Sequence, residues 1–108
     1  MSIQLIGLLL ALRIISLPYA VSAMAIEAGV DPRLASCVVT WESAWDTTEI
    51  STSGAVGLFQ IMPETAKWAA GKLGIEHYDL MNPVDNTVLG LYILQTNPRW
   101  FLVYEWCE

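Results

Sequence analysis

The stretch ESAWDTTEISTSGAVGLFQIMP occupies residues 42–63 and joins the end of one apolar helix to the start of the next. Thr, Ser and Gly dominate the segment from Asp46 to Gly57, a composition that is typical of a loop. A short β-hairpin between Thr48 and Leu58 is the strand-like alternative that this pattern leaves open. Pro63 then marks a helix start, because its fixed φ suits the first helical turn. The stretch therefore predicts two helices separated by a loop or a hairpin.

The helix before this stretch has a strong start signal. Asp31-Pro32 combines an N-cap side chain with a proline at the first helical position. Apolar residues then recur at spacings of four and three, as on the buried side of a helix, and the helix reaches Glu42 near its end.

The remaining chain shows the same alternation of helical runs and punctuated loops. Further helices are expected over Tyr19 to Ala28 (ended by Gly29), Pro63 to Leu73 (ended by Gly74), Pro83 to Leu94 (started by Asn82 and ended by Asn97-Pro98) and Arg99 to Trp106. The predicted fold class is mainly α.

The first residues are unusually apolar. The run from Ile3 to Leu17 is broken by few polar residues, is expected to stop at Pro18, and is shorter than the roughly 20 residues that a membrane-spanning helix needs. Small residues that end at Ala23 suit a signal peptidase, although Arg13 lies inside the run and no basic residue precedes it. Three interpretations stay open: a cleaved signal peptide, a retained anchor with membrane association through residues 3–17, or a hydrophobic helix packed on the domain. We expect a leader over residues 1–23 and one domain over residues 24–108.

The composition of the chain argues against several classes of function. The 108 residues carry eleven acidic and five basic side chains, for a net charge of −6, which argues against nucleic-acid binding. The five Trp predict either a tight aromatic core or rings that line a cleft. The one histidine, His77, lies in a polar stretch typical of a surface loop, and neither metal-ligand spacing nor a phosphate-binding glycine loop is present. No metal or other cofactor is therefore expected.

Glu42 is the acidic residue that stands out. It follows Trp41 and precedes Ser43, on a helix of otherwise apolar and small residues, and Trp45 lies nearby in the sequence. A carboxyl group placed against aromatic rings loses hydration, which raises its pKa and keeps it protonated near neutral pH. Such a glutamic acid can donate a proton to a leaving oxygen.

The ordered series that begins at Glu42 resembles the signature of the soluble lytic transglycosylase family. That pattern runs Glu-Ser, an aromatic residue, a polar loop, Ser, Gly-Ala and Gly-Leu-Met-Gln-Ile-Met-Pro. The positions that match without gaps are Glu42-Ser43, Ser51, Gly54-Ala55, Gly57-Leu58, Gln60 and Met62-Pro63. Further matches are Gly29-Val30-Asp31-Pro32 and Leu34 before Glu42, and Asn86, Gly90 and Tyr92-Ile93-Leu94 after the motif, so the resemblance covers about Val21 to Leu94.

The resemblance implies a lysozyme-like helical fold, related to goose-type lysozyme, and a single catalytic carboxyl. In this family one Glu first protonates the oxygen between N-acetylmuramic acid (MurNAc) and N-acetylglucosamine (GlcNAc). It then deprotonates the muramic acid 6-hydroxyl, which attacks C1 and leaves a 1,6-anhydro end. Glu42 takes this role here, so that neither Asp46 nor Glu49 is needed as a second carboxylate. The alternatives are a hydrolytic muramidase, which uses water, and an inactive glycan-binding relative within a secretion apparatus or a phage particle.

Substrate-binding residues are expected around Glu42. Ser43 is expected to hydrogen-bond near the carboxyl group, Gly57 to allow close backbone approach, and Gln60 to bind sugar hydroxyl and N-acetyl groups. Phe59 and Met62 are expected to pack against an apolar sugar face. The matching Ser51 completes this predicted set within the motif. The implied partner is the peptidoglycan glycan strand, and the implied location is the periplasm, the cell envelope or a phage virion.

The chain departs from the family pattern in the loop and at its C-terminal end. Asp46-Thr47 replaces the usual Asn-Pro, and Phe59 replaces the usual first Met of the motif. The family carries an Ala-Tyr-Asn-Ala-Gly segment whose tyrosine closes the catalytic pocket. Tyr104 is the candidate for that tyrosine, but Glu105 takes the Asn position and the glycine and following helix are missing. We therefore expect a domain that is shortened at this end.

The two cysteines lie far apart in the sequence. Cys37 falls within the predicted helix that carries Glu42, and Cys107 is next to the last residue. In an oxidising compartment they would bridge and hold the C-terminal end in place. A buried, unpaired Cys37 is the equally weighted alternative.

Overall fold

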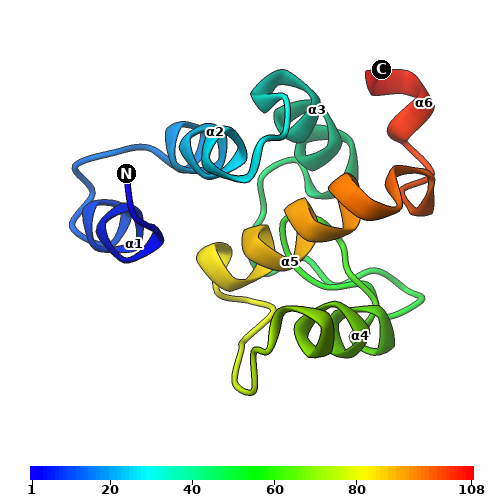
Figure 1. Ribbon diagram of the computed structural model, residues 1–108. Helices are drawn as coiled ribbons and strands as arrows, with labels where there is room; N and C mark the ends of the chain where they lie inside the picture. The colour runs from blue at the N-terminus through cyan, green and yellow to red at the C-terminus, as the bar shows by residue number, and fades with distance from the viewer.

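The computed structural model describes residues 1–108 and is mainly helical, as predicted. The helices are α1 (Ile3–Ala11), α2 (Leu17–Ala28), α3 (Pro32–Ser43), α4 (Pro63–Leu73), α5 (Pro83–Thr96) and α6 (Tyr104–Cys107), with a 3₁₀ turn η1 (Pro98–Trp100) before α6. The helix α5 lies in the middle, with α2 and α3 on one side and α4 on the other (Figure 1).

Local sequence signals set the helix bounds where they were predicted. Asp31 Oδ1 accepts a hydrogen bond from the Arg33 amide at 2.9 Å, and Asn82 caps α5 in the same way. Gly29 and Gly74 end α2 and α4 with φ of 75° and 71°, a conformation that costs glycine little. The predicted last helix is wrong in its extent: residues 98–107 form η1 and α6 in place of one helix.

The apolar N-terminal run folds into one short helix and the start of a second. Helix α1 ends at Ala11, Arg13 turns the chain at φ 61°, and α2 already begins at Leu17. The expected stop at Pro18 is therefore wrong. Proline fits the first turn of a helix, where its missing N–H is not needed, and Ser16 Oγ caps that turn by accepting from the Tyr19 amide at 3.2 Å.

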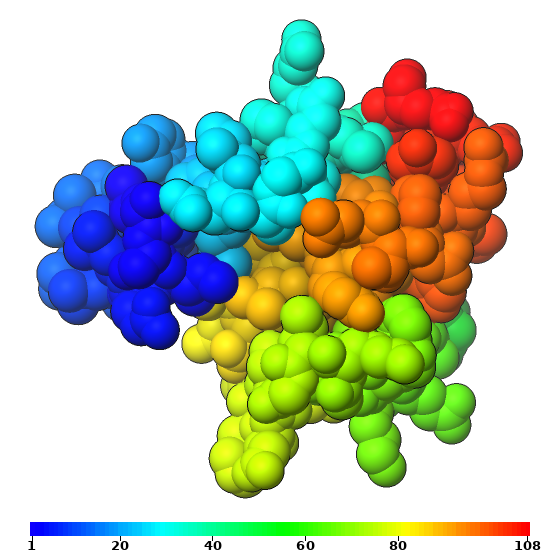
Figure 2. Space-filling view, viewed as in Figure 1, coloured from blue at the N-terminus to red at the C-terminus, as the bar shows by residue number.

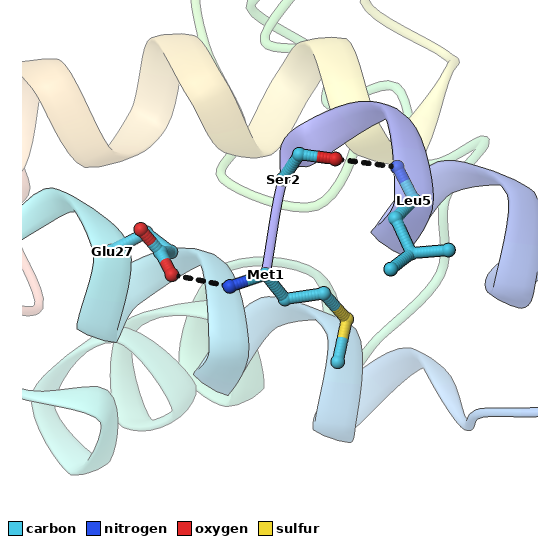
Figure 3. A network of polar contacts seen from close by, with 4 residues as sticks. All are labelled: Met1, Ser2, Leu5 and Glu27. Carbon is cyan, nitrogen blue, oxygen red and sulfur yellow. Dashed lines mark hydrogen bonds and ion pairs between the residues drawn. The ribbon is translucent and has the colours of Figure 1, made fainter.

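The N-terminal segment lies against the rest of the domain. Ile6 is fully buried, and the ammonium group of Met1 pairs with Glu27 of α2 at 2.6 Å (Figure 3). In the same figure, Ser2 Oγ caps α1 by accepting from the Leu5 amide. No helix of the chain is both long enough and apolar enough to span a membrane.

The segment between α3 and α4 is a compact loop held by α5. Its only β-type pairing is two isolated antiparallel bridges, Ile50 to Val56 and Val56 to Ile61, so the hairpin alternative is reduced to single bridges. Buried Asn86 of α5 fixes the loop: its Oδ1 accepts from the Phe59 amide at 2.8 Å, and its Nδ2 donates to the carbonyls of Val56 and Leu80, both at 2.9 Å. These bonds anchor the loop to the helix in the middle of the domain.

A disulfide joins the C-terminal end to α3. Cys37 and Cys107 are bonded, across 70 residues of sequence, with their Cα atoms 5.7 Å apart. Of the two alternatives left open by the sequence, the bridge is the one formed. Next to it, the rings of Trp41 and Trp106 pack edge to face at 5.3 Å. The bridge and the ring pair hold α6 against the helix that carries Glu42.

Candidate active site

Glu42 lies in the last turn of α3 with its side chain half-buried. Its carboxyl group makes no ion pair and no hydrogen bond within the protein, so nothing inside the domain compensates the charged form. Burial raises the pKa of Glu42 from its ordinary value of 4.5 to about 7. The carboxyl group is thus poised to exchange a proton near neutral pH.

The backbone on both sides of the loop adopts left-handed conformations. Ala44 and Trp45, which follow α3 directly, have φ of 50° and 68°, and Gln60 has φ 50°. Such values are uncommon for residues with a side chain and concentrate at functional sites. Here they turn the chain sharply after Glu42 and again where the loop returns to the same region.

Glu42 lines a cleft of about 310 Å³ together with residues from the loop and the C-terminal segment. The other lining residues are Ser51, Ser53, Ala55, Gln60, Met62, Trp100 and Leu102. Glu42 is the one titratable side chain among them. Of the predicted site residues, the cleft brings together Glu42, Ser51, Gln60 and Met62.

Gln60 is the polar residue best placed to bind a ligand here. Its side-chain Nε2 donates to the carbonyls of Glu49 and Gly57, both at 3.0 Å, which fixes the amide plane. Its Oε1 accepts no hydrogen bond from the protein. Because Gln60 lines the cleft, this oxygen can accept from a bound hydroxyl or amide.

Ser51 lies in the loop between α3 and α4 and also lines the cleft. Its Oγ accepts a hydrogen bond from the Ala55 amide at 3.0 Å and lies 3.0 Å from the Oγ of Ser53. The two hydroxyl groups therefore form a pair on the cleft wall, where one of them can also bond to a ligand.

Four predicted site residues do not line the cleft. Ser43 is buried, and its Oγ donates to the carbonyl of Val39 at 3.3 Å and not to the Glu42 carboxyl. Phe59 is fully buried against α5 at Gly90, where a Cβ atom would collide with its ring. The prediction of a sugar contact for Phe59 is therefore wrong, because the loop turns this side chain into the core.

The other two exceptions are Gly57 and Tyr104. Gly57 is buried with φ 77°, where a Cβ atom would collide with Asn86 and with the Leu80 carbonyl, so it serves the packing of the loop on α5. Tyr104 lines a neighbouring hollow with Arg99, whose guanidinium lies 5.8 Å from the centroid of the Tyr104 ring.

The aromatic side chain in the cleft differs from the one expected. Trp41 is 60% exposed and packs on Trp106, and the Trp45 indole donates to Thr40 Oγ1 at 3.0 Å. The ring that lines the cleft with Glu42 belongs to Trp100, from η1. The five Trp predict either an aromatic core or rings that line a cleft, and no local pattern identifies Trp100 as the one in the cleft.

Neither candidate for a second carboxylate lines the cleft. Asp46 is fully exposed, and hydrogen bonds from the backbone and side chain of Thr48 lower its pKa. These bonds give Asp46 a turn-capping role in the loop. The side chain of Glu49 is exposed, and its carbonyl anchors Gln60. No group of three or more His, Cys, Asp or Glu side chains is arranged to hold a metal ion.

A larger apolar cavity, of about 370 Å³, lies between α1, α2, α4 and α5. Its one charged side chain, Glu27, is paired with the Met1 ammonium group. The cavity therefore offers no group for acid–base chemistry, and the cleft at Glu42 is the candidate active site.

Comparisons with known proteins identify the family of this chain. The family model of the transglycosylase SLT domain matches residues 20–106. A transglycosylase of Enterobacteria phage PRD1 is 37% identical over 78 residues, which are 71% of this chain and 27% of the phage protein.

Two solved structures are similar in fold and sequence. The 70 kDa soluble lytic transglycosylase of Escherichia coli is 30% identical with a TM-score of 0.61, over 70% of this chain and 14% of that protein. An inactive Glu-to-Gln mutant of lytic transglycosylase Slt from Pseudomonas aeruginosa is also 30% identical, with a TM-score of 0.65, over 74% of this chain and 14% of that protein. The chain thus spans about a quarter or less of each relative's length. With its motif, its fold and a family match over most of its residues, the chain belongs to the transglycosylase SLT domain family.

Proposed function

We propose that this protein is a peptidoglycan lytic transglycosylase that cleaves the β-1,4 bond between MurNAc and GlcNAc. The observation that carries the proposal is Glu42, a half-buried carboxyl group with a pKa of about 7, alone in a cleft lined by Gln60 and a serine pair. The relatives named above support the reaction class, and the inactive mutant of the P. aeruginosa relative is a Glu-to-Gln change.

The proposed reaction uses Glu42 twice. Protonated Glu42 donates its proton to the oxygen between the two sugars, the C1–O bond breaks, and the bonding electron pair stays on the departing oxygen. The 6-hydroxyl of the same muramic acid then attacks C1, and its proton passes to the Glu42 carboxylate. The carboxyl group is thereby restored and no water is consumed. Because the nucleophile is part of the substrate, its proximity replaces a second catalytic side chain.

The remaining cleft residues are assigned to substrate binding. Gln60 Oε1 is proposed to accept from a sugar hydroxyl or N-acetyl N–H, and the Ser51 hydroxyl to bond to a second polar group of the sugar. Met62 and Leu102 offer apolar contacts to the sugar rings. These contacts would orient the glycosidic bond beside the Glu42 carboxyl group. The binding energy of the sugar rings would in this way contribute to the rate of cleavage.

A hydrolytic muramidase is the competing reaction, and the products distinguish the two. Hydrolysis adds one water to the new reducing end, whereas the transglycosylase product is lighter by that water. Mass spectrometry of fragments released from purified peptidoglycan should show anhydro ends alone. Hydrated ends would show that the protein hydrolyses the bond and would contradict the proposed transglycosylase reaction.

Substitution of Glu42 tests the catalytic assignment. Glu42→Gln should lower the rate of peptidoglycan cleavage at least about 100-fold, because general acid–base groups contribute factors of this size. Glu76→Gln is the matched control, since Glu76 is exposed in a loop outside the cleft. Asp46→Asn and Glu49→Gln should each retain activity. Loss of activity in either one would point to a two-carboxylate mechanism.

A glycan-binding protein without activity is the second candidate, because the pocket-closing tyrosine expected from the family does not line the cleft. In that case the parent protein would bind intact peptidoglycan and release no fragments. The phage relative gives a natural setting, and we propose action on the cell wall from a phage particle or the periplasm.

The role of residues 1–23 is also a proposal. A signal peptide cut after Ala23 would divide α2 and remove Ile6, Ala20 and Val21, all of them buried. This packing supports the alternative in which the segment stays as part of the domain. The mass of the protein purified from its natural source separates the two interpretations.

A further inference from the structure

A second hollow adjoins the cleft and shares one wall with it. It has a volume of about 290 Å³ and is lined by Glu64, Thr65, Trp68, Ile93, Asn97 and Trp100. Trp100 lines both hollows, and Glu64 and Thr65 follow Met62 of the cleft on the first turn of α4. The second hollow therefore continues the cleft between α4 and the C-terminal end of α5. Figure 2 shows the green atoms of α4 directly against the orange atoms of α5 on this side of the molecule.

Two tryptophans of this hollow are held in place while their rings remain accessible. Trp68 is 45% exposed, although its ring packs on that of Tyr92 with 5.8 Å between centroids. Trp100 is braced at 5.2 Å by the ring of Phe101, which is fully buried. Rings fixed in this way lose little conformational entropy when they bind a ligand.

The polar side chains of the hollow have no partners within the protein. The Asn97 amide, the Thr65 hydroxyl and the Glu64 carboxylate make no hydrogen bond or ion pair with other residues, and all three residues line the hollow together with the two tryptophans. A few unengaged polar groups around apolar walls are typical of a ligand site. A pyranose ring has the matching chemistry, with C–H groups on its faces and hydroxyl groups on its edge.

We infer that Trp68, Trp100 and Asn97 form an additional sugar-binding subsite, which takes a GlcNAc unit of the glycan strand beyond the disaccharide that occupies the cleft at Glu42. The inference rests on the proposed function. Glu64, the one charged lining residue, sets the preference for this sugar. Its negative charge opposes the anionic stem peptide carried by MurNAc, whereas GlcNAc is uncharged.

Because the subsite lies beyond the cleft, its contribution to affinity should depend on the number of sugar units in the ligand. A disaccharide occupies the cleft alone, whereas a longer oligomer also reaches the second hollow. Truncation of a well-packed aromatic anchor commonly costs a factor of about ten in affinity. Trp68→Ala should therefore weaken the binding of long oligomers about tenfold and leave the binding of the disaccharide unchanged.

The experiment uses the full chain with Glu42→Gln, so that ligands are bound and not cleaved. Dissociation constants for the di-, tetra- and hexasaccharides of GlcNAc are measured by calorimetry, with and without Trp68→Ala. Tyr19→Ala is the matched control, because Tyr19 of α2 is 55% exposed and lines neither hollow. The expected result is a loss confined to Trp68→Ala and to the longer oligomers.

Other outcomes overturn the inference in distinguishable ways. Equal affinities of Trp68→Ala and its parent for every oligomer would exclude the subsite, as would the same loss for the disaccharide and the hexasaccharide. Both results leave the proposed function intact if the unsubstituted protein still releases anhydro products. If Glu42→Gln binds no oligomer and the unsubstituted protein cleaves nothing, the proposed function fails and the subsite fails with it. Stronger binding of a peptide-bearing fragment than of a peptide-free one of equal length would overturn the preference for GlcNAc.

Discussion

Replacing Glu42 by Gln should stabilise this protein, and the gain should depend on pH. The Glu42 carboxyl group is half-buried and has no partner in the protein. Its pKa rises from 4.5 to about 7, so the folded protein binds this proton more tightly than the unfolded chain does. The contribution of this bound proton to the free energy of unfolding is therefore fully present below pH 4.5 and is lost as the pH rises through 7. Gln has nearly the same shape and never becomes charged, so Glu42→Gln avoids this loss.

The size of the gain follows from the pKa. One pKa unit is worth about 1.4 kcal/mol, so the full change from 4.5 to about 7 sets a ceiling of about 3 kcal/mol. The side chain is open to the cleft, and solvent screens a group of this kind, which reduces the expected gain to about 1–2 kcal/mol above pH 7.5. For a domain of this size that gain raises Tm by roughly 5–10 °C. Below pH 4.5 the two proteins should have equal stability.

Urea unfolding of both proteins from pH 4 to pH 8, followed by the fluorescence of the five Trp residues, measures this difference. The parent and the variant share every other titratable group, so the difference between their unfolding free energies isolates Glu42. It should grow between pH 4.5 and 7 and then level off. A difference that stays constant with pH, or a variant that is less stable than the parent at pH 8, would refute the desolvated carboxyl and with it the physical basis of the acid role.

Three further predictions concern the same architecture. The rate of peptidoglycan cleavage (kcat/KM) should fall about tenfold per pH unit above about 7, because the protonated form of Glu42 is the acid; a rate that stays level to pH 9 contradicts this role. Cys37→Ser with Cys107→Ser should cost up to about 4 kcal/mol by thermal unfolding, since the bridge closes a loop of 70 residues, and should slow cleavage because the C-terminal segment carries part of the cleft wall. Gly90→Ala should cost about 1–3 kcal/mol by urea unfolding, because the added Cβ would collide with the buried ring of Phe59, and unchanged stability would show that this contact can relax.

Features governed by neighbouring residues could be predicted from the sequence. The starts of α3 and α5 follow from cap-and-proline pairs at Asp31 and Asn82, and the ends of α2 and α4 from glycines in the left-handed conformation. Glu42 stands out in the same way, as an acidic residue at the end of an apolar helix. Each of these signals acts within a few residues, so tertiary packing does not alter it. The catalytic role of Glu42, in contrast, is implied by the resemblance of residues 42–63 to the family pattern.

Side-chain directions in the loop could not be predicted, and Phe59 and Gln60 show why. The two residues are adjacent, yet Phe59 points into the core and Gln60 lines the cleft. In a helix or strand, periodicity assigns each side chain to a face, but this rule has no meaning where φ is positive, as at Gln60. The directions here are set by Asn86, 27 residues after Phe59, whose amide binds the loop backbone.

The cleft wall depends on contacts that are even more distant in sequence. The family pattern assigns the pocket-closing role to a tyrosine, and Tyr104 was the candidate, but Trp100 and Leu102 are the residues of this segment that line the cleft with Glu42. Their placement follows from the disulfide to Cys107 and from the burial of Phe101 between them, both of which join the segment to the rest of the domain. Leu102 is 89% exposed, so this wall borders the cleft at Glu42 without sealing it from solvent and without supplying a second charge. The cleft is therefore built by α3, which carries Glu42, and by the C-terminal segment, which carries Trp100 and Leu102, so cutting the disulfide that holds this segment should slow cleavage even though Glu42 itself is unchanged.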